Sequence, residues 1–441
     1  MRLLYNILLP VFFLLSAPYY LWKLLRRGGW RAGFFQRLGW HAPALREALA
    51  GRRVLWIHAV SVGEATLAAQ LVSELGSLLS GWELVVSTTT TTGMAVLRKQ
   101  LPPGAHTVYF PVDLLPCVRA AWRALNPAAV VLMEAEVWPN FLWQAQSQGV
   151  PVALANARLS DRSWRGYRRW SGIFAPFFSG LHCVGAANEA DAVRLRQLGC
   201  LESCVEVTGN MKFDGAAAPR EPGLDAGAIL RQIGAAEGAP VLVAGSTHEG
   251  EEELLAQVAV RLRRAHPGLV LVLVPRHFER APAVAEQLRS LGVSFQLRTS
   301  LRPSDAAAAG CLLVDTTGEL RAFYEAATVV FVGKSLRAQG GQNPIEPAAL
   351  GKPVVFGPHM QNFRAVVGML LAERAAVQLA DEDELEPVLA ALLDDAPERK
   401  ALGERARAVV CANQGATQRT AAMVARMLEP AGGGPGSDLR N

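Results

Sequence analysis

The residues Val54-Leu-Trp-Ile-His-Ala-Val-Ser-Val-Gly-Glu64 combine a short apolar run with the start of a helical pattern. A run of this length is typical of a buried strand, and a serine three residues before a glutamate is typical of a helix start. The stretch therefore predicts a strand from Val54 to Val60 and a helix that begins after Ser61. A strand that leads directly into a helix is the repeating unit of a parallel α/β sheet.

The same alternation of strand and helix recurs along the chain in two series. The first series continues with predicted strands at Leu84–Ser87, Thr107–Phe110, Ala129–Met133, Val152–Ala155, His182–Gly185 and Val205–Thr208. A stretch rich in Ala, Pro and Gly then interrupts the pattern, and the second series comprises Pro240–Ala244, Leu269–Val274, Val293–Leu297, Cys311–Val314, Val329–Val332 and Pro353–Phe356. Sheets of this kind bind ligands at the carboxyl ends of their strands.

These patterns predict two Rossmann-like α/β domains that face a cleft. We expect the first domain at 27–215, a linker at 216–227, the second domain at 228–429 and a disordered Gly-rich tail at 430–441. The length of 441 residues agrees with two domains, because it exceeds the usual size of one hydrophobic core. A hydrophobic content of 51% with 19% charged residues argues against disorder.

Charge and motif content limit the possible functions. The formal net charge of +5 favours an anionic partner, such as a membrane surface, a phosphorylated substrate or a nucleic acid. No G-x-G-x-x-G follows the first strand of either domain, and the sequence contains no P-loop or G-x-S-x-G motif. The six cysteines and eight histidines show no metal-ligand spacing, so we expect no bound metal and reduced cysteines.

The N-terminal stretch from Leu3 to Trp22 is almost wholly apolar and close to the roughly 20 residues that a helix needs to cross a bilayer. Basic residues follow it directly, at Lys23, Arg26, Arg27, Arg31 and Arg37. Because positive charge stays on the cytoplasmic side, we predict a membrane-anchoring helix at 1–26 with both domains on the cytoplasmic side of the membrane. A helix that lies in the interface and a cleaved signal peptide are the alternatives.

A four-residue pattern with Ser, Thr or Asn first and Glu last recurs after predicted strands. It occurs at Ser61–Glu64, Ser246–Glu249, Thr316–Glu319 and Asn343–Glu346. The simpler interpretation of each is a helix capping box. Because helix N-termini also attract anions, the turns at Ser246, Thr317 and Asn343 suit a nucleotide phosphate. Glu64, in the first domain, is then the candidate base that deprotonates a sugar hydroxyl.

Other charged residues lie near predicted strand ends. Arg276 can chelate a phosphate through its paired donors, although a surface role is the simpler interpretation. Glu134 and Glu136 follow a strand and could hydrogen-bond an acceptor sugar. A basic cluster is spaced to share one helix face and consists of Arg158, Arg162, Arg165 and Arg169. A solvated face, a phosphorylated lipid and single-stranded nucleic acid all fit this cluster, and the apolar N-terminus argues against the last.

Six motifs together resemble the bacterial 3-deoxy-D-manno-octulosonic acid (Kdo) transferases. They are His58-Ala-Val-Ser-Val-Gly-Glu64, Glu134-Ala-Glu-Val-Trp-Pro139, Asn156-Ala-Arg-Leu-Ser160, Gly209-Asn-Met-Lys-Phe-Asp214, Val274-Pro-Arg-His277 and Asn343-Pro-Ile-Glu-Pro347. The resemblance implies a GT-B glycosyltransferase fold, CMP-Kdo as the donor and a phosphorylated lipid A precursor as the acceptor at the inner membrane. It implies no metal, no other cofactor and no nucleic acid.

The resemblance also implies roles for individual residues. Glu64 is expected to be the catalytic base of an inverting transfer. The donor contacts that it implies are Pro275, Arg276, Thr317, Gly318, Glu319, Asn343, Pro344, Ile345 and Glu346. Ser246 is added to them because its turn suits a phosphate. The expected acceptor contacts are Glu134, Glu136, Arg158, Arg162 and Lys212. Two positions depart from the family pattern, which commonly has histidine at Gln342 and glycine at Lys334. A GT-B enzyme for another nucleotide sugar and a catalytically silent scaffold are the remaining alternatives.

Overall fold

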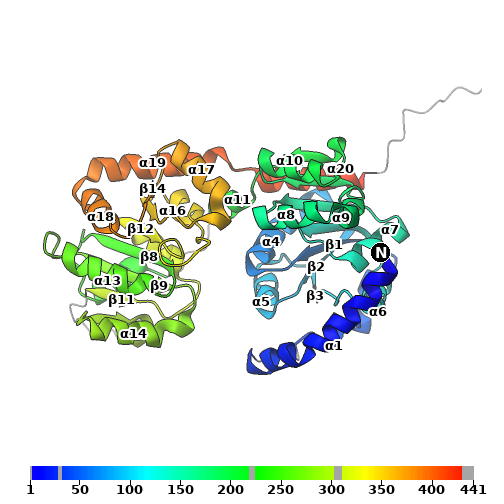
Figure 1. The fold of residues 1–441 in the computed structure, drawn as a ribbon, viewed down its shortest axis with the longest axis horizontal. Coiled ribbons are helices and arrows are strands. Elements are labelled where there is room, and N and C mark those ends of the chain that lie inside the picture. The colour runs from blue at the N-terminus through cyan, green and yellow to red at the C-terminus, as the bar shows by residue number, and fades with distance from the viewer. Residues whose placement is uncertain (1, 28–31, 218–223, 302–309, 430–441) are drawn as a thin grey trace, which may run out of the picture. The chain divides into compact units, whose positions relative to one another are not determined.

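The computed structural model describes residues 2–27, 32–217, 224–301 and 310–429, without the side chains of 18–27. It divides the chain into two compact units, one of residues 1–215 and 414–441 and the other of residues 216–413 (Figure 1). Each unit contains a seven-stranded sheet in which every described strand pair is parallel. The predicted pair of parallel α/β domains is therefore confirmed.

The sheet of the first unit has the strand order β3-β2-β1-β4-β5-β6-β7. Its strands are β1 (Arg53–Ala59), β2 (Trp82–Thr88), β3 (His106–Tyr109), β4 (Pro127–Met133), β5 (Val152–Ala157), β6 (Cys183–Ala186) and β7 (Val205–Val207). The helices are α1 (Arg2–Arg27), α2 (Phe34–Arg37), α3 (Pro43–Leu49), α4 (Val62–Leu78), α5 (Thr91–Gln100), α6 (Leu115–Leu125), α7 (Pro139–Gln148), α8 (Asp161–Arg169), α9 (Ser171–Phe178), α10 (Glu189–Gln197), η1 (Glu202–Cys204), α11 (Lys212–Ala217) and α20 (Ala416–Leu428).

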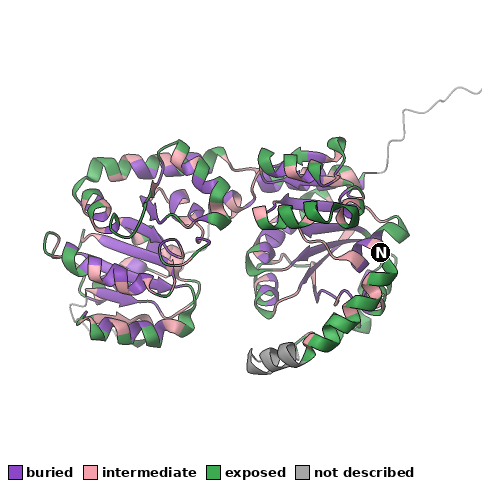
Figure 2. Cartoon of the chain, in the orientation of Figure 1, coloured by how far each residue is buried: buried purple, intermediate pink, exposed green. Residues whose placement is uncertain are grey.

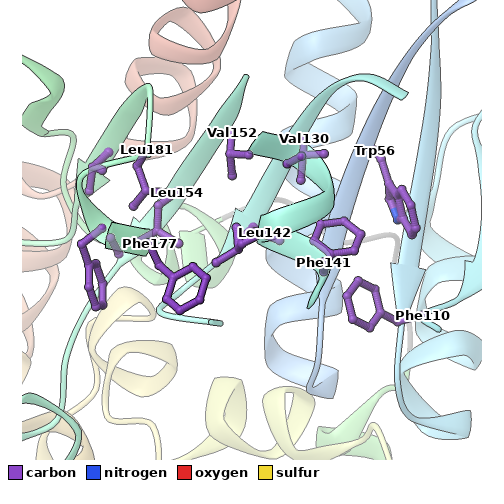
Figure 3. Packing of buried hydrophobic residues seen from close by; sticks show 14 of the residues in the cluster. Trp56, Phe110, Val130, Phe141, Leu142, Val152, Leu154, Phe177 and Leu181 are labelled. Atoms are coloured by element: carbon purple, nitrogen blue, oxygen red, sulfur yellow. The ribbon is translucent and has the colours of Figure 1, made fainter. Parts of the chain in front are cut away.

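Alternate residues of β1 show why this sheet is covered on both faces. Trp56 packs with Phe110 and Phe141 in one core cluster (Figure 3). Leu55 and Ile57 belong to a second cluster on the opposite face, together with residues of α4 and α20. Because successive side chains of a strand point to opposite faces, a strand buried on both sides reads as one continuous apolar run.

The sheet of the second unit has the strand order β10-β11-β9-β8-β12-β13-β14. Its strands are β8 (Val241–Thr247), β9 (Val270–Pro275), β10 (Phe295–Leu297), β11 (Cys311–Leu313), β12 (Val329–Val332), β13 (Val354–Phe356) and β14 (Val377–Gln378). The helices are α12 (Ala226–Gln232), α13 (Glu251–Leu262), η2 (Phe278–Arg280), α14 (Ala281–Ser290), η3 (Arg298–Ser300), α15 (Leu320–Ala326), α16 (Ile345–Ala349), η4 (Gln361–Phe363), α17 (Arg364–Ala372), α18 (Leu385–Asp394) and α19 (Ala396–Ala412). Every predicted strand has a counterpart here or in the first sheet, and only the two-residue β14 was missed.

The helix α20 differs from the sequence-based division of the chain. The second domain was expected to extend to residue 429, but residues from Gln414 onward belong to the first unit. The apolar side of α20 is buried in the same cluster as α4, and the Asp214 carboxylate accepts hydrogen bonds from the backbone N–H groups of Gly415 and Thr417 at 2.6 Å each. An amphipathic pattern predicts that a helix face is buried, but not against which sheet.

The N-terminal segment forms α1, whose first turns contact the first unit. The Tyr5 hydroxyl donates to Asp113 Oδ2 at 2.8 Å, and the Asn6 and Asn140 side chains exchange hydrogen bonds at 2.9 and 3.0 Å. Much of the remaining apolar surface of this segment is exposed, including Leu3 and Leu14 at 77% each (Figure 2). Among the residues that the structure describes, no helix is long and apolar enough to cross a membrane. Part of the predicted linker, at 218–223, and the predicted tail at 430–441 lie outside the described residues.

Candidate active site

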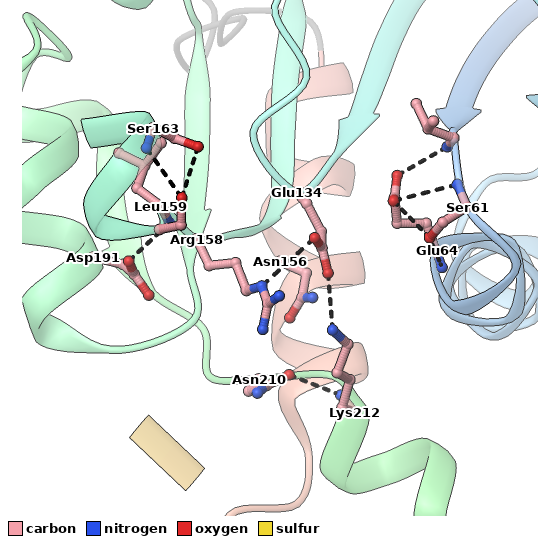
Figure 4. A network of polar contacts seen from close by, with 12 residues as sticks. Ser61, Glu64, Glu134, Asn156, Arg158, Leu159, Ser163, Asp191, Asn210 and Lys212 are labelled. Atoms are coloured by element: carbon pink, nitrogen blue, oxygen red, sulfur yellow. Dashed lines mark hydrogen bonds and ion pairs between the residues drawn. The ribbon is translucent and has the colours of Figure 1, made fainter. Parts of the chain in front are cut away.

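Glu64 lies at the start of α4, directly after β1, and only 7% of its surface is exposed. Its Oε1 accepts hydrogen bonds from the Ser61 hydroxyl at 2.7 Å and the Ser61 N–H at 3.3 Å, and its Oε2 accepts one from the Val60 N–H at 2.9 Å (Figure 4). The Ser61 hydroxyl oxygen in turn accepts from the Glu64 N–H at 3.2 Å. The predicted capping box is therefore confirmed, and it fixes the direction of the carboxylate.

The other three predicted capping boxes are wrong. Ser246 lies within β8, and α13 begins only at Glu251 after an N-cap glycine. The helices α15 and α16 begin at Leu320 and Ile345, and the residue before each makes no side-chain cap hydrogen bond. In all three places a loop separates the strand from the helix, so the glutamate does not reach the third helical position that a capping box requires.

Glu134 contacts two other residues that the sequence assigned to acceptor binding. Its Oε1 lies 3.0 Å from Lys212 Nζ, and its Oε2 lies 3.5 Å from Arg158 Nε. Figure 4 shows the carboxylate of Glu134 between these two cations. Nearby, Asn156 Oδ1 accepts from the Met211 N–H at 3.0 Å, which holds the start of α11 against the end of β5.

Glu136 lies on the turn between β4 and α7 and is partly buried. Burial, with a smaller contribution from the negative charges of Glu64 and Glu134, raises the pKa of its carboxyl group to about 7. The mutual influence of these side chains indicates that the three carboxylates belong to one region of the first unit. A carboxyl group with this pKa can either donate or accept a hydrogen bond near neutral pH.

The basic cluster is not arranged as the sequence predicted. The helix α8 begins at Asp161, so Arg158 lies in the preceding loop and cannot share its face with the other arginines. Arg158 contacts Glu134, whereas Arg162 and Arg165 are exposed on the helix. The periodicity argument failed because the helix starts later than the charge pattern suggested.

The second unit holds a buried carboxylate that the sequence analysis missed. Glu251 is fully buried, and each of its oxygens accepts two backbone hydrogen bonds. Oε2 accepts from His248 at 2.9 Å and Lys334 at 2.7 Å, and Oε1 accepts from Ser335 at 2.8 Å and Leu336 at 3.1 Å. This side chain ties the loop after β12 to the turn after β8.

Positive charge gathers around this turn. The pKa of His248 is lowered to about 4, mainly by burial and also by its basic neighbours, which are Lys334, His277, Arg280 and Arg276. Arg276 is exposed directly after β9, and its backbone N–H donates to the Thr247 carbonyl at 3.0 Å. Arg280 is partly neutralised by Glu252 at 2.6 Å. An excess of cations at the ends of adjacent parallel strands suits a phosphate group.

The topology brings the predicted donor contacts to one edge of the second sheet. The strands β11, β9, β8 and β12 are neighbours in that order, and the predicted contacts lie within the last residues of these strands or in the segments that follow them. They are Ser246, Pro275, Arg276, Thr317, Gly318, Glu319, Asn343, Pro344, Ile345 and Glu346. Glu319 is not free, because its carboxylate pairs with Arg298 at 3.1 Å and accepts from the Thr316 hydroxyl at 2.7 Å. Whether these residues bind a donor stays a prediction.

Within the described ranges no three His, Cys, Asp or Glu side chains gather as a metal site. The expected independence from metal stays a prediction.

Comparisons with known proteins agree with this picture. Residues 32–215 match the family model described as 3-deoxy-D-manno-octulosonic-acid transferase (kdotransferase). The 3-deoxy-D-manno-octulosonic acid transferase of Bordetella pertussis is 36% identical, covering 91% of this chain and 94% of its own. The protein of the same name from Haemophilus influenzae is 31% identical, covering 85% and 87%. A solved glycosyltransferase from Rickettsia africae shares the fold, with a TM-score of 0.57 over 86% of this chain and 99% of its own at 12% identity.

Proposed function

Since the chain belongs to the 3-deoxy-D-manno-octulosonic acid transferase family, we propose that it moves Kdo from CMP-Kdo to a hydroxyl group of a phosphorylated lipid A precursor, with inversion at the anomeric carbon. It is a glycosyltransferase of the Kdo transferase family, and its two parallel-sheet units are like those of GT-B enzymes. The observation that carries the proposed mechanism is the buried Glu64 carboxylate, fixed at a helix start in the region of Glu134 and Glu136.

Glu64 is the proposed base. Among its described contacts, Oε2 accepts only the Val60 N–H, which leaves a lone pair for a substrate hydroxyl. As the acceptor oxygen bonds to the anomeric carbon of Kdo, its proton passes to Glu64, the bond from that carbon to the phosphate oxygen breaks, and CMP leaves with the electron pair. Glu136, which is about half ionised near pH 7, can hydrogen-bond the acceptor sugar in either direction.

The second unit is the proposed donor domain. Arg276 and Lys334 supply positive charge for the departing phosphate, in the electropositive surroundings of His248. Glu346, which is partly buried, is placed to accept hydrogen bonds from ribose hydroxyls. With protein cations in this role, the transfer is proposed to need no metal.

The first unit is the proposed acceptor domain. Arg158 and Lys212, which both contact Glu134, are proposed to contribute positive charge toward an acceptor phosphate. Arg162 adds a further exposed cation. We place the protein at the cytoplasmic face of the inner membrane, where the exposed apolar residues of α1 would meet lipid, and we expect no nucleic acid partner.

The test is transfer by the purified full chain in detergent. A lipid A precursor and CMP-Kdo generated in the same tube are incubated with the protein, and the lipid is followed by mass spectrometry. A gain in whole Kdo units supports donor and acceptor together. Glu64→Gln should abolish transfer, whereas Glu74→Gln, a matched change further along α4, should not. If the lipid stays unchanged while a reference enzyme is active beside it, the proposed donor or acceptor is wrong. If Glu64→Gln retains full activity, the assignment of Glu64 as the base is wrong.

A further inference from the structure

A cavity that is open to solvent lies in the first unit, apart from the carboxylates of the candidate site. It has a volume of about 440 Å³ and is lined by Gly39, Trp40, His41, Arg46, Ala120, Arg123 and Ala124. The lining residues belong to the segment between α2 and α3, to α3 itself and to the second half of α6. No carboxylate contributes to this lining.

The cavity lies at the end of the first sheet that is opposite to the candidate site. The helix α6 ends at Leu125 and leads into β4 at Pro127, whereas Glu134 follows the other end of β4. A strand of seven residues spans roughly 20 Å, at about 3.3 Å per residue. Arg123 and Glu134 therefore lie near opposite ends of the same strand.

The polar groups of the cavity are suited to an anion. Arg46 and Arg123 are both exposed, and neither forms an ion pair with another described residue. His41 is only 8% exposed, and neither of its ring nitrogens has a hydrogen-bond partner in the described part of the chain. Burial, together with the charge of Arg46, lowers the pKa of His41 to about 4, so its ring is neutral and presents one N–H donor.

The wall of the cavity is held in place by packing. The ring of Trp40 stacks on Phe35 with centroids 5.8 Å apart and an interplanar angle of 9°. Gly39 has a φ of 87°, and a Cβ there would lie 2.4 Å from the Cys117 carbonyl oxygen on α6. Only glycine lets the segment approach α6 this closely, so Trp40 and His41 are positioned without any ligand.

We propose that this cavity binds a phosphate group, with Arg46 and Arg123 as charged donors, the His41 N–H as a neutral donor and Trp40 covering the apolar or sugar part of the ligand. A buried donor without a partner is costly, and a phosphate oxygen would satisfy it. The planar arginine side chains can bind phosphate oxygens through paired donors. The site is independent of the transfer reaction, and its phosphate can come from a lipid headgroup or from a free molecule.

The experiment compares two arginines one turn apart on α6. Arg123 lines the cavity and Arg119 does not, and both are exposed. Inorganic phosphate is titrated into the wild-type full chain, Arg123→Gln, Arg46→Gln and Arg119→Gln, and binding is followed by phosphorus NMR line width. Loss of one charge-assisted hydrogen bond should weaken binding about tenfold in the Arg123 and Arg46 variants, with no change for Arg119→Gln.

A second arm identifies the source of the phosphate. The same variants are sedimented with phosphatidylglycerol vesicles, with phosphatidylcholine vesicles as the neutral reference. Weaker vesicle binding by Arg123→Gln than by Arg119→Gln assigns the site to lipid headgroups, whereas an effect on inorganic phosphate alone assigns it to a free ligand. Equal behaviour of Arg123→Gln and Arg119→Gln in both arms overturns the proposal, because general positive charge would then explain any binding.

Discussion

Replacement of Glu251 by glutamine should destabilise the second unit without changing its shape. The two side chains have nearly the same volume, but glutamine has one acceptor oxygen and one NH₂ group. In the structure each carboxylate oxygen accepts two backbone N–H groups, from His248 and Lys334 on one side and from Ser335 and Leu336 on the other. Whichever way the amide turns, two buried N–H groups meet another donor.

The size of the effect follows from these two orphaned donors. A buried donor without a partner costs about 1–3 kcal/mol, so two of them cost about 3 kcal/mol after local relaxation. A domain of this size unfolds in urea with a slope of about 2 kcal/mol per molar. The urea midpoint of the second unit should therefore fall by about 1.5 M.

The distribution of tryptophan makes the assay selective. All ten tryptophans lie before residue 171, in the first unit, and the second unit contains none. Far-ultraviolet circular dichroism reports both units, whereas tryptophan fluorescence reports only the first. Glu251→Gln should shift an unfolding transition seen by dichroism and leave the fluorescence transition in place. Glu249→Gln, on the exposed part of the same turn, is the matched control. A dichroism midpoint equal to that of the control would refute this account of Glu251.

Three further predictions concern the first unit and use the tryptophan signal. Because the pKa of Glu136 is raised to about 7, its contribution to stability is present below about pH 4 and is lost as the pH rises through 7. The unfolding free energy of the first unit should therefore decline by about 1–2 kcal/mol between pH 5 and 8. Glu136→Gln should flatten this decline. Gly39→Ala should lower the unfolding free energy by about 3 kcal/mol, since the φ is 87° and the added Cβ meets backbone atoms. Gly51→Ala, with a φ of 72° and open space around the added Cβ, should lower it by about 1 kcal/mol. Equal losses of stability would contradict the packing argument. Asp214→Ala should lower the unfolding free energy of this unit by about 2–3 kcal/mol, because three hydrogen bonds to the start of α20 are lost. An unchanged urea midpoint would show that α20 does not stabilise this unit.

The sequence predicted the sheets well because their physical signal is local. A strand covered on both faces is largely apolar, as residues 54–57 of β1 and all of β9 are, and such runs are visible without knowledge of the partners. The two-residue β14 was missed because it is too short to form a pattern. The capping box of Glu64 was predicted correctly because α4 follows β1 after only two residues, which leaves no room for another geometry.

The candidate site was harder to predict where its contacts are distant in sequence or involve the backbone. Three of the four hydrogen bonds to Glu251 come from backbone N–H groups 83 to 85 residues further along the chain. Backbone donors are the same in every residue except proline, so no sequence pattern distinguishes them. The pairing of Glu134 with Arg158 and Lys212 also depends on which strands are neighbours, which the order of strands along the chain does not reveal.

The candidate regions of the two units share an unusual backbone conformation that no side-chain pattern predicts. Four non-glycine residues at the carboxyl ends of strands have left-handed conformations: Glu134, Asn156, Ser246 and Lys334, with φ between 51° and 58°. Each such residue costs about 1 kcal/mol and persists only where the surroundings enforce it. At Lys334, a position where the resembling family commonly has glycine, the enforcing contact is the 2.7 Å hydrogen bond from its N–H to Glu251. Lysine is therefore tolerated at a position where glycine would be free of backbone strain. Compared with glycine, Lys334 adds a cation beside His248, which strengthens the positive potential at the proposed site of the donor phosphate.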